Sequence, residues 1–509
     1  MPGTRSTARS GRFSPRSSRA AEASSRPGRE EATALISPRI REVLKIGRDL
    51  GLDFYDLVFE VIPWDVMNEI AAYGLPIRAH HWSYGRVYQR QRVHGRMGLS
   101  KIYEIVLNND PAYAFLLDTN TEVENLLIVA HVAAHADFFK NNACFEGTNR
   151  NMVNEAAAHA VRIEQYKEEY GIERVERLMD AAFALERHVD PYKGLYREEY
   201  PKRTVEVREA VVDEYADLTV EGRPFSQVKQ VKGGKIPAHP ERDLLWFLAR
   251  YAPLDEWERD VLEIVREEAY YFFPQFNSKI LNEGWASYWH AEIISQYPGM
   301  TPREMIDFSV LHGNVVQPGH PLQVNPYYLG YKILVDVKKR WDRMHARGES
   351  RLDGTEKLFE IRTSEDDFSF LRNYLTPGLV KELGLFAYGP ACSCPPHTPR
   401  PCPRCGDVAI RSRDVDAVVE AILKPRYNYG APKVVVTDTA GGVLRLEHDE
   451  PGTVLDREYA EKTLAYIHEL WKAPVQLITA NERGEGMEYW CDEKGARVTL
   501  RAGTGARRG

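Results

Sequence analysis

Apolar positions recur at the spacing of an α-helix through most of residues 36–390. By this pattern, the stretch from Ile128 to Asn142 is one amphipathic helix, and residues 120–124 before it supply capping side chains. A second helix is predicted from Asp255 to Phe273. Pro274 is expected to end it, because proline lacks the N–H that a helix interior needs. The region is therefore predicted to be a large, mainly helical domain.

Three shorter features refine this prediction. A helix containing residues 282–290 includes Gly284, which costs about 1 kcal/mol relative to alanine, so we expect another backbone to approach it closely. A further helix is predicted to begin after a turn at Asn325. The run from Tyr103 to Leu107 has the composition of a short strand.

Residues 407–500 follow a different pattern, with short runs of β-branched and aromatic residues. Lys433–Val436 and Val443–Leu446 flank a glycine-containing turn, which predicts a hairpin. Asp456 is predicted to cap a helix. Further strands are expected within 475–478, 487–490 and 498–500. The fold class is therefore predicted to be α+β, with a small C-terminal α+β domain after the helical one.

The remaining segments are predicted to be tails and a linker. Residues 1–35 are rich in arginine and serine, and the first 29 residues hold seven arginines and one acid, Glu22. This composition predicts a disordered tail, with an organelle transit peptide or a nucleic-acid-binding arm as alternatives. Residues 391–406 form a linker rich in cysteine and proline, and residues 501–509 a second tail.

Composition narrows the class of protein. The chain has 509 residues, and its hydrophobic fraction of 43% is typical of a globular protein. Its net charge of −7 gives no general positive field that would attract nucleic acid. We expect no membrane span, because no stretch approaches about 18 consecutive apolar residues. Six cysteines in a chain of this length do not form a disulfide scaffold, and the clustering of four of them fits a reducing compartment better.

The strongest candidate chemistry lies on the helix from Ile128 to Asn142. His131 and His135 are four residues apart, so they share one helix face. Two imidazoles on an apolar face are costly to bury unless they are bound, and this spacing suits a metal ion. The alternative is a pair of core histidines with ordinary hydrogen bonds. Asp137 falls off this face and ranks below the histidines.

Other acids and histidines could complete such a site. Glu155 and His159 repeat the four-residue spacing on a predicted helix, with a surface ion pair as the alternative. Glu268 lies on the apolar face of its helix, where a carboxylate must be paired, protonated or metal-bound. Glu283 and His290 are seven residues apart on one open face, next to Asn282.

Four cysteines allow a separate structural site. Two close pairs could form a tetrahedral zinc site, and the alternative is a flexible linker with free thiols. The residues are Cys392, Cys394, Cys402 and Cys405.

Several motifs together resemble the SpoVR family, the stage V sporulation protein R group. They are residues 131–142 (HVAAHADFFKNN), 268–275 (EAYYFFPQ), 279–290 (KILNEGWASYWH), 325–330 (NPYYLG) and 370–375 (FLRNYL). The resemblance implies a bacterial cytoplasmic protein linked to spore cortex formation or stress response. It also implies association with a serine protein kinase and a von Willebrand-type protein. It implies no particular reaction.

A weaker resemblance concerns the gluzincin metallopeptidases. There, two histidines at this spacing and a glutamate on a later helix bind zinc, which implies that His131, His135 and Glu283 are metal ligands here. Val132 stands where that family has its general-base glutamate. Glu155 or Glu268 could replace the base only if the fold brings it to the site.

Two hypotheses follow. The first is a metal-dependent hydrolase acting on a peptide or a cell-wall-related substrate, with a divalent ion, zinc before iron or manganese. Glu155 and Glu268 are then candidate catalytic groups, and His159, His290, Asp137 and Asn282 support the ligands or bind a second ion. A di-iron or di-manganese bundle ranks lower. The second hypothesis is a non-catalytic regulatory or scaffold protein with a degenerate metallopeptidase-like core, working with a partner kinase system.

Overall fold

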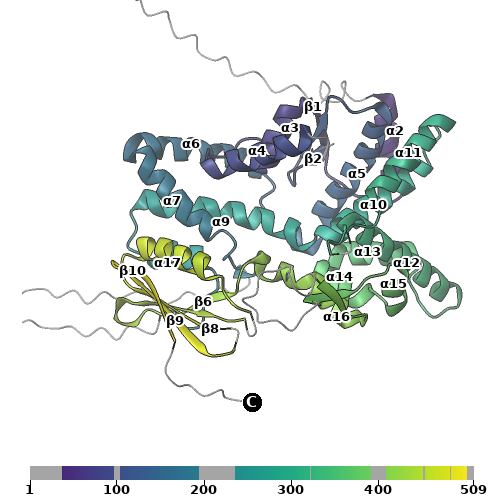
Figure 1. Ribbon diagram of the computed structural model, residues 1–509. Coiled ribbons are helices and arrows are strands. Elements are labelled where there is room, and N and C mark those ends of the chain that lie inside the picture. Colours follow the sequence, from purple (N-terminus) through teal and green to yellow (C-terminus); the bar gives the residue numbers. More distant parts are fainter. Residues whose placement is uncertain are drawn as a thin grey trace, which may run out of the picture.

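The computed structural model describes residues 37–96, 104–193, 236–320, 322–390, 408–450, 453–481 and 483–500. The chain forms a helical body with one small sheet at its top, and a second sheet covers the opposite side near the C-terminus (Figure 1). The predicted α+β class, with a mainly helical N-terminal part, is confirmed.

Helices make up most of the described chain. In the first half they are α2 (Pro38–Asp49), α3 (Trp64–Tyr73), α4 (Trp82–Arg96), α5 (Glu122–Asn141), α6 (Met152–Tyr170) and α7 (Ile172–Ala184). They continue as α8 (Leu244–Tyr251), α9 (Glu256–Asn277), α10 (Lys279–Ser295), α11 (Pro302–Val315), α12 (Pro326–Ala346), α13 (Gly354–Ser364), α14 (Asp367–Tyr374) and α15 (Pro377–Glu382). Last come α16 (Val415–Leu423) and α17 (Arg457–Trp471).

A three-stranded sheet lies against α5. Its strands are β1 (Leu57–Ile62), β2 (Glu104–Val106) and β3 (Ala112–Leu117), in the order β1-β3-β2. β1 runs parallel to β3, and β2 pairs antiparallel with it as an edge strand. The expected strand within 103–107 is thus confirmed. Val132 of α5 belongs to an apolar cluster with Leu116 of β3, and Val106 of the edge strand packs against this cluster.

α10 packs between α5 and α12 (Figure 1). Its contact with α12 is made backbone to backbone, because Gly284 and Gly330 face each other. A Cβ atom on Gly284 would lie 2.4 Å from the carbonyl carbon of Gly330, and one on Gly330 would lie 2.1 Å from the carbonyl oxygen of Ile280. The close approach expected at Gly284 is therefore confirmed.

We expect Gly284→Ala to lower the free energy of unfolding by about 1–3 kcal/mol or more, because the added methyl group has to push two helix backbones apart. Gly313→Ala is the matched control. Gly313 also lies within a helix, α11, but a Cβ atom there meets nothing within 4 Å. It should gain about 0.5–1 kcal/mol from helix propensity. Urea unfolding of both variants measures the difference, and equal effects would contradict the packing described.

One helix boundary differs from the prediction. α9 does not end at Phe273 but continues through Pro274 to Asn277, so the prediction that Pro274 stops the helix is wrong. Proline removes one backbone hydrogen bond, and here that loss falls in the last turn of the helix. Ser278 helps to close this turn, because its N–H and its hydroxyl both donate to the Pro274 carbonyl.

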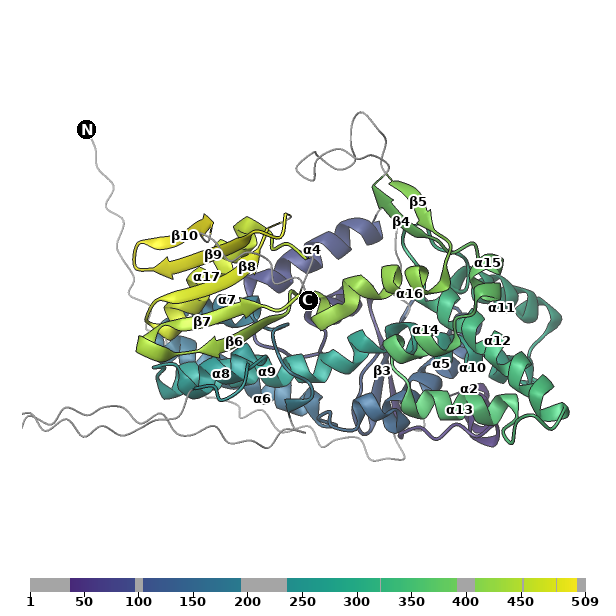
Figure 2. The same cartoon turned by 90° about the horizontal axis from the view of Figure 1, so that it is seen from below.

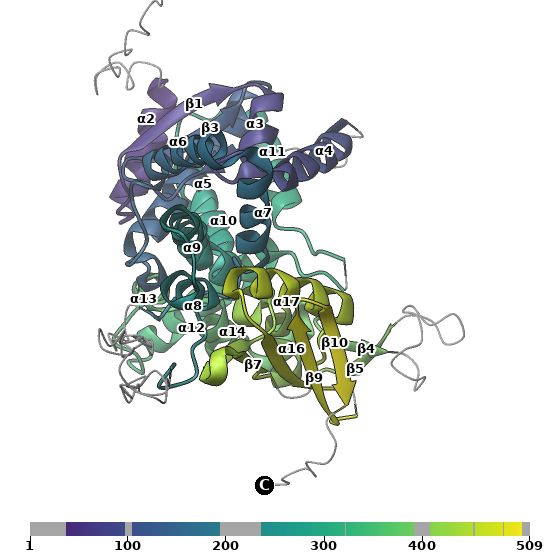
Figure 3. The same cartoon turned by 90° about the vertical axis from the view of Figure 1, so that its left-hand side faces the viewer.

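The C-terminal sheet contains β6 (Val434–Asp438), β7 (Leu444–His448), β8 (Val475–Ala480), β9 (Gly486–Asp492) and β10 (Gly495–Leu500), in the order β10-β9-β8-β7-β6. The predicted hairpin is the antiparallel pair β6–β7, and the predicted cap is Asp456, whose side chain accepts from Tyr459 N–H. α17 lies between this sheet and α7 (Figure 3). Trp471 stacks on Phe247 of α8, so this sheet shares a core with the helical body.

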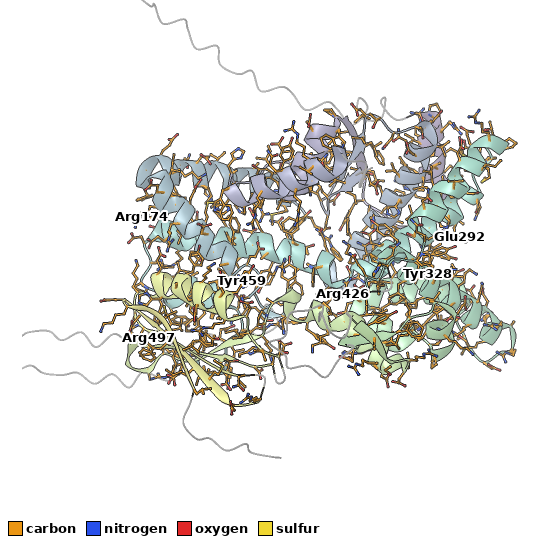
Figure 4. All side chains as sticks on the ribbon, viewed as in Figure 1. Arg174, Glu292, Tyr328, Arg426, Tyr459 and Arg497 are labelled. Atoms are coloured by element: carbon orange, nitrogen blue, oxygen red, sulfur yellow. The ribbon has the colours of Figure 1, made fainter. Side chains whose placement is uncertain are left out.

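The chain on either side of residues 391–407 meets in a two-stranded sheet. β4 (Ala387–Pro390) pairs antiparallel with β5 (Val408–Ser412), next to α16 (Figure 2). Beyond α16 lies Arg426, which is labelled in Figure 4. It donates to Asp367 at 2.9 Å and to the Phe276 carbonyl at 3.4 Å, and so joins this segment to α14 and α9. The four clustered cysteines lie outside the described residues.

Across the described ranges, no helix combines the length and the apolar character needed to cross a membrane.

Candidate metal centre

α5 carries two histidines into the interior of the protein. A capping box between Thr121 and Glu124 fixes the start of this helix, as expected from residues 120–124. The α5 residues from Leu126 to Phe139 are nearly all buried, so His131 and His135 are both enclosed. Their Nε2 atoms lie 3.0 Å apart. The predicted four-residue spacing therefore brings both imidazoles to one point.

Glu283 of α10 joins the two histidines. Its Oε2 lies 3.7 Å from His131 Nε2 and 3.4 Å from His135 Nε2. This oxygen is buried, yet it makes no hydrogen bond that meets ordinary geometric limits. Within the described chain, this is the group of His, Cys, Asp and Glu side chains whose ligand atoms all lie within 4.8 Å of one another. We refer to these three residues as the triad.

The spacing of the triad suits a tetrahedral ion. With metal–ligand bonds of about 2.0–2.1 Å, adjacent ligands of a tetrahedral zinc ion are about 3.3 Å apart. The three separations here, 3.0, 3.4 and 3.7 Å, surround that value. A buried carboxylate oxygen without a good donor would gain a partner from a bound cation. The donor set of two imidazoles and one carboxylate therefore fits a divalent metal.

The outer nitrogens of the two histidines are held by other side chains. His135 Nδ1 lies 2.9 Å from Asn282 Oδ1, which can only accept, so Nδ1 carries the proton and Nε2 presents its lone pair to the triad. His131 Nδ1 lies 3.0 Å from His290 Nδ1, and His290 Nε2 lies 2.7 Å from His312 Nδ1. Such partners set the tautomer and orientation of metal ligands.

Burial and charge act against each other in the triad. Burial alone would raise the pKa of Glu283, but the interactions with His131 and His135 outweigh it and hold that pKa below its usual range. Burial would lower the pKa of His135, but the Glu283 carboxylate raises it. Burial and the neighbouring His135 both lower the pKa of His131. The negative charge therefore stays on Glu283, as a ligand requires.

A cavity of about 450 Å³ opens beside the triad. Its lining includes His131 and His290, and α11 and the start of α12 form one wall. Tyr327 stacks on His131 with 6.1 Å between ring centroids. The lining residues are Glu104, Glu124, Leu127, Ile128, His131, His290, Leu311, Asn314, Val315, Asn325 and Tyr327.

Sequence reasoning missed two polar groups near the triad, Glu104 and His312. Glu104 comes from the edge strand β2, and His312 from α11. The run around Glu104 predicted a strand but gave no reason for an acid to matter there. His312 carried no spacing signal at all. Only the packing of β2 and α11 against α5 reveals them.

Glu268 and His159 lie in a different buried cluster. Glu268 Oε2 lies 2.5 Å from Arg78 Nε, and Glu268 Oε1 lies 3.3 Å from His159 Nδ1. The other nitrogen of His159 lies 3.5 Å from Glu267 Oε2. A carboxylate on the apolar face of α9 was expected to be paired, protonated or metal-bound, and the structure shows it paired with Arg78. No contact joins either residue to the triad in the part of the chain described.

Glu155 and Asp137 also make their contacts elsewhere. Glu155 is half-exposed, and its Oε1 lies 3.5 Å from Asn151 Nδ2. The fully buried Asp137 accepts from Arg362 at 2.8 Å, from Trp285 Nε1 at 3.0 Å and from the backbone N–H of Asp53 at 2.8 Å. Of the residues predicted to support the ligands, the structure brings His290 and Asn282 to the triad.

All three triad residues lie in the part of the chain that matches a known protein family. Residues 30–393 match the family model described as SpoVR like protein. The chain belongs to the SpoVR family. The family resemblance drawn from the sequence motifs is thereby confirmed. One relative is the Escherichia coli (strain K12) protein described as "Uncharacterized protein YcgB", 31% identical over 382 residues, which are 69% of this chain and 74% of the relative. No solved structure matches.

In this SpoVR-family chain, the cluster of His159, Glu267 and Glu268 predicts how the free energy of unfolding depends on pH. Burial alone would lower the pKa of His159, but hydrogen bonds with Glu267 and Glu268 raise it to about 9. Because folding raises this pKa, protonated His159 stabilises the folded protein. That stabilisation is fully present below about pH 6.5 and is lost as the pH rises through 9. We expect the wild type to lose about 2–3 kcal/mol more than His159→Gln between pH 6.5 and pH 10. Urea unfolding at both pH values measures this. Parallel pH profiles would show that His159 is not protonated in the folded protein.

Proposed function

We propose that this SpoVR-family protein is a metal-dependent hydrolase that holds one divalent ion, zinc in the first place, with His131, His135 and Glu283. The observation that carries the proposal is the arrangement of the triad: three ligand atoms 3.0, 3.4 and 3.7 Å apart, with the buried Glu283 Oε2 lacking a good hydrogen-bond donor.

Three protein ligands suit a catalytic rather than a structural ion. A zinc ion held this way keeps a fourth position for water and lowers the pKa of that water to about 7. The chain's own residues would orient the ligands, because Asn282 and His290 hold the outer nitrogens of the two histidines. The cavity, which His131 lines, would hold a substrate of small size next to this ligand.

The general base of the metallopeptidase pattern is not supplied by the residues we expected. Val132 is fully buried and packs against the three-stranded sheet. Glu155 and Glu268 make their contacts away from the triad. A missing base typically costs 10²–10⁴-fold in rate. This observation favours the second candidate function, a non-catalytic scaffold with a degenerate metal centre that works with a kinase system.

Metal analysis and peptide cleavage separate the two candidates. Protein purified without an affinity tag should contain about one zinc, iron or manganese ion per chain if the triad binds metal. The metal-loaded protein should then cleave members of a mixed peptide library or of a cell-wall muropeptide digest, as followed by mass spectrometry, and chelator-treated protein should not. Bound metal without any metal-dependent cleavage would favour the scaffold. Less than about 0.2 ion per chain, with full helicity in chelator, would contradict both metal-binding versions.

The biological process and the partners form a separate part of the proposal. A role in spore cortex formation or stress response, together with a serine protein kinase and a von Willebrand-type protein, follows from the family resemblance. The E. coli relative carries a description that names no process. Affinity purification of the full chain from its own host tests the partners, and recovery of neither protein would count against them.

A further inference from the structure

We propose that the cavity beside the triad binds a substrate carrying a protonated amine, and that Glu104 receives this amine. The inference rests on the proposed metal site and adds a substrate class to it. It starts from Glu104, a carboxylate in the cavity lining that sequence reasoning did not single out.

The edge strand β2 aims Glu104 at α5. Glu104 and Val106 are two residues apart in the strand, so their side chains share one face of the sheet. Val106 packs against an apolar cluster that contains Ile128 and Val132 of α5. Glu104 therefore faces the same helix, and it lines the cavity together with Ile128 and His131.

Glu104 has no direct hydrogen-bond or ion-pair partner in the described structure. Among the residues described, it makes no hydrogen bond or ion pair, although it is half-buried. A carboxylate in this position is costly to ionise alone, and an ammonium group would pair with it.

The rest of the lining selects against anions. None of the residues that line the cavity is lysine or arginine, and a second carboxylate, Glu124, lies in the lining while its Oε2 accepts from the Thr121 backbone N–H. Four side chains provide an apolar surface for the remainder of a ligand: Leu127, Ile128, Leu311 and Val315. A cavity of about 450 Å³ is within the range of small-molecule sites. The fitting ligand is a small, partly apolar amine.

Hydroxamates can test whether Glu104 receives an amine, and the natural substrate need not be known, because hydroxamates bind a zinc ion directly. Two matched pairs place the amine near the metal or far from it: L-leucine hydroxamate with its N-acetyl form, and 6-aminohexanehydroxamate with hexanehydroxamate. The near pair represents the amino terminus of a peptide, and the far pair represents a side-chain amine. Acetohydroxamate, which carries no amine, reports the metal site alone. Binding to the zinc-loaded full chain is measured by titration calorimetry.

We expect the amine-bearing member of at least one pair to bind about 10- to 100-fold more tightly than its neutral partner, as a charge-assisted contact implies. Glu104→Gln should remove this preference and leave acetohydroxamate affinity unchanged. Glu60→Gln is the matched control, because Glu60 is exposed on β1 of the same sheet and is absent from the cavity lining. It should keep the preference. Melting curves of both variants confirm that they fold.

The same measurements distinguish a failure of the metal-site proposal from a failure of the amine proposal. If wild-type protein loaded with zinc does not bind acetohydroxamate, the metal site itself is wrong and the amine proposal falls with it. If acetohydroxamate binds but neither pair shows an amine preference, or if the preference survives in Glu104→Gln, the amine proposal is wrong and the metal site stands. Equal weakening of all probes by Glu104→Gln would also overturn it, because Glu104 would then act on the metal-binding group.

Discussion

Replacing Glu283 by glutamine is expected to reduce zinc affinity by more than about 100-fold. The expectation follows from the ligand set. The amide keeps the volume of the side chain but removes the negative charge that faces two imidazoles at 3.4 and 3.7 Å. A residue that only supports a ligand costs 10- to 100-fold when it is lost, so a ligand itself should cost more. Equilibrium dialysis of zinc against a competing chelator measures the change.

Thermal stability gives an independent reading of the same variant. Zinc that binds only the folded protein raises its melting temperature by mass action. Wild-type protein should therefore melt at a higher temperature with zinc than in chelator, whereas Glu283→Gln should show almost no difference. Glu292→Gln is the matched control on the same helix, because Glu292 lies outside the triad (Figure 4). Unchanged zinc affinity in Glu283→Gln, with a lowered melting point in chelator, would make Glu283 a structural residue.

Arg362→Met is expected to give the largest loss of stability, about 3–5 kcal/mol of unfolding free energy. The reason is Asp137, a fully buried carboxylate on α5 whose partner at 2.8 Å is the Arg362 guanidinium. Removing one member of a buried ion pair leaves the other charge uncompensated. Burial already raises the pKa of Asp137 to about 6, against the opposing effect of Arg362. Removing Arg362 should raise this pKa further, so the buried carboxylate is more costly to ionise in the variant than in the wild type. The loss should therefore be larger at pH 8 than at pH 5.

Three further variants separate this role from a role in metal binding: Asp137→Asn with Arg362→Met, Arg347→Met, and Asp137→Asn alone. Asp137→Asn combined with Arg362→Met removes both charges and should recover part of the lost stability. Arg347→Met, at the exposed end of α12, should change stability by less than about 0.5 kcal/mol. Zinc stoichiometry should be unchanged in all three. A loss of bound zinc in the folded Asp137→Asn single variant would return Asp137 to the metal site, where the sequence had placed it as a supporting residue.

Local signals in the sequence predicted local structure well. The residues Thr121 and Glu124, three apart, predicted the start of α5, and the capping box is present. The glycine turn before Val443 predicted the β6–β7 hairpin. Gly284 predicted a close backbone contact, although only the packing shows that Gly330 provides it. Pro274 misled the prediction, because the cost of proline depends on where in the helix it falls, and the extra turn after it could not be read from spacing.

Residue spacing predicted only those groups of the site that share one helix face. His131 and His135 share a helix face by geometry alone, and His290 follows Glu283 on one face of α10. Glu268 was assigned to the same site because a carboxylate on an apolar face needs a partner. The partner is Arg78, which lies in the chain before α4 and carries no signal of this contact.

Glu104 shows the opposite error, because no feature of the sequence assigned it to the site although it lies near the triad. Its strand is short and at a sheet edge, and its chemical interest arises only because β2 packs on α5. No periodicity links positions so far apart in the chain. Such long-range pairings are set by how the helices and the sheet pack together, whereas caps and turns are set by neighbouring residues.

Anomalous X-ray diffraction at the zinc edge, from crystals of the full chain grown with zinc, tests the central claim most directly. The account predicts one strong peak about 2.0–2.2 Å from Nε2 of His131, Nε2 of His135 and an oxygen of Glu283. A map with no peak at the triad, while the same crystals show zinc bound elsewhere on the protein, would contradict it.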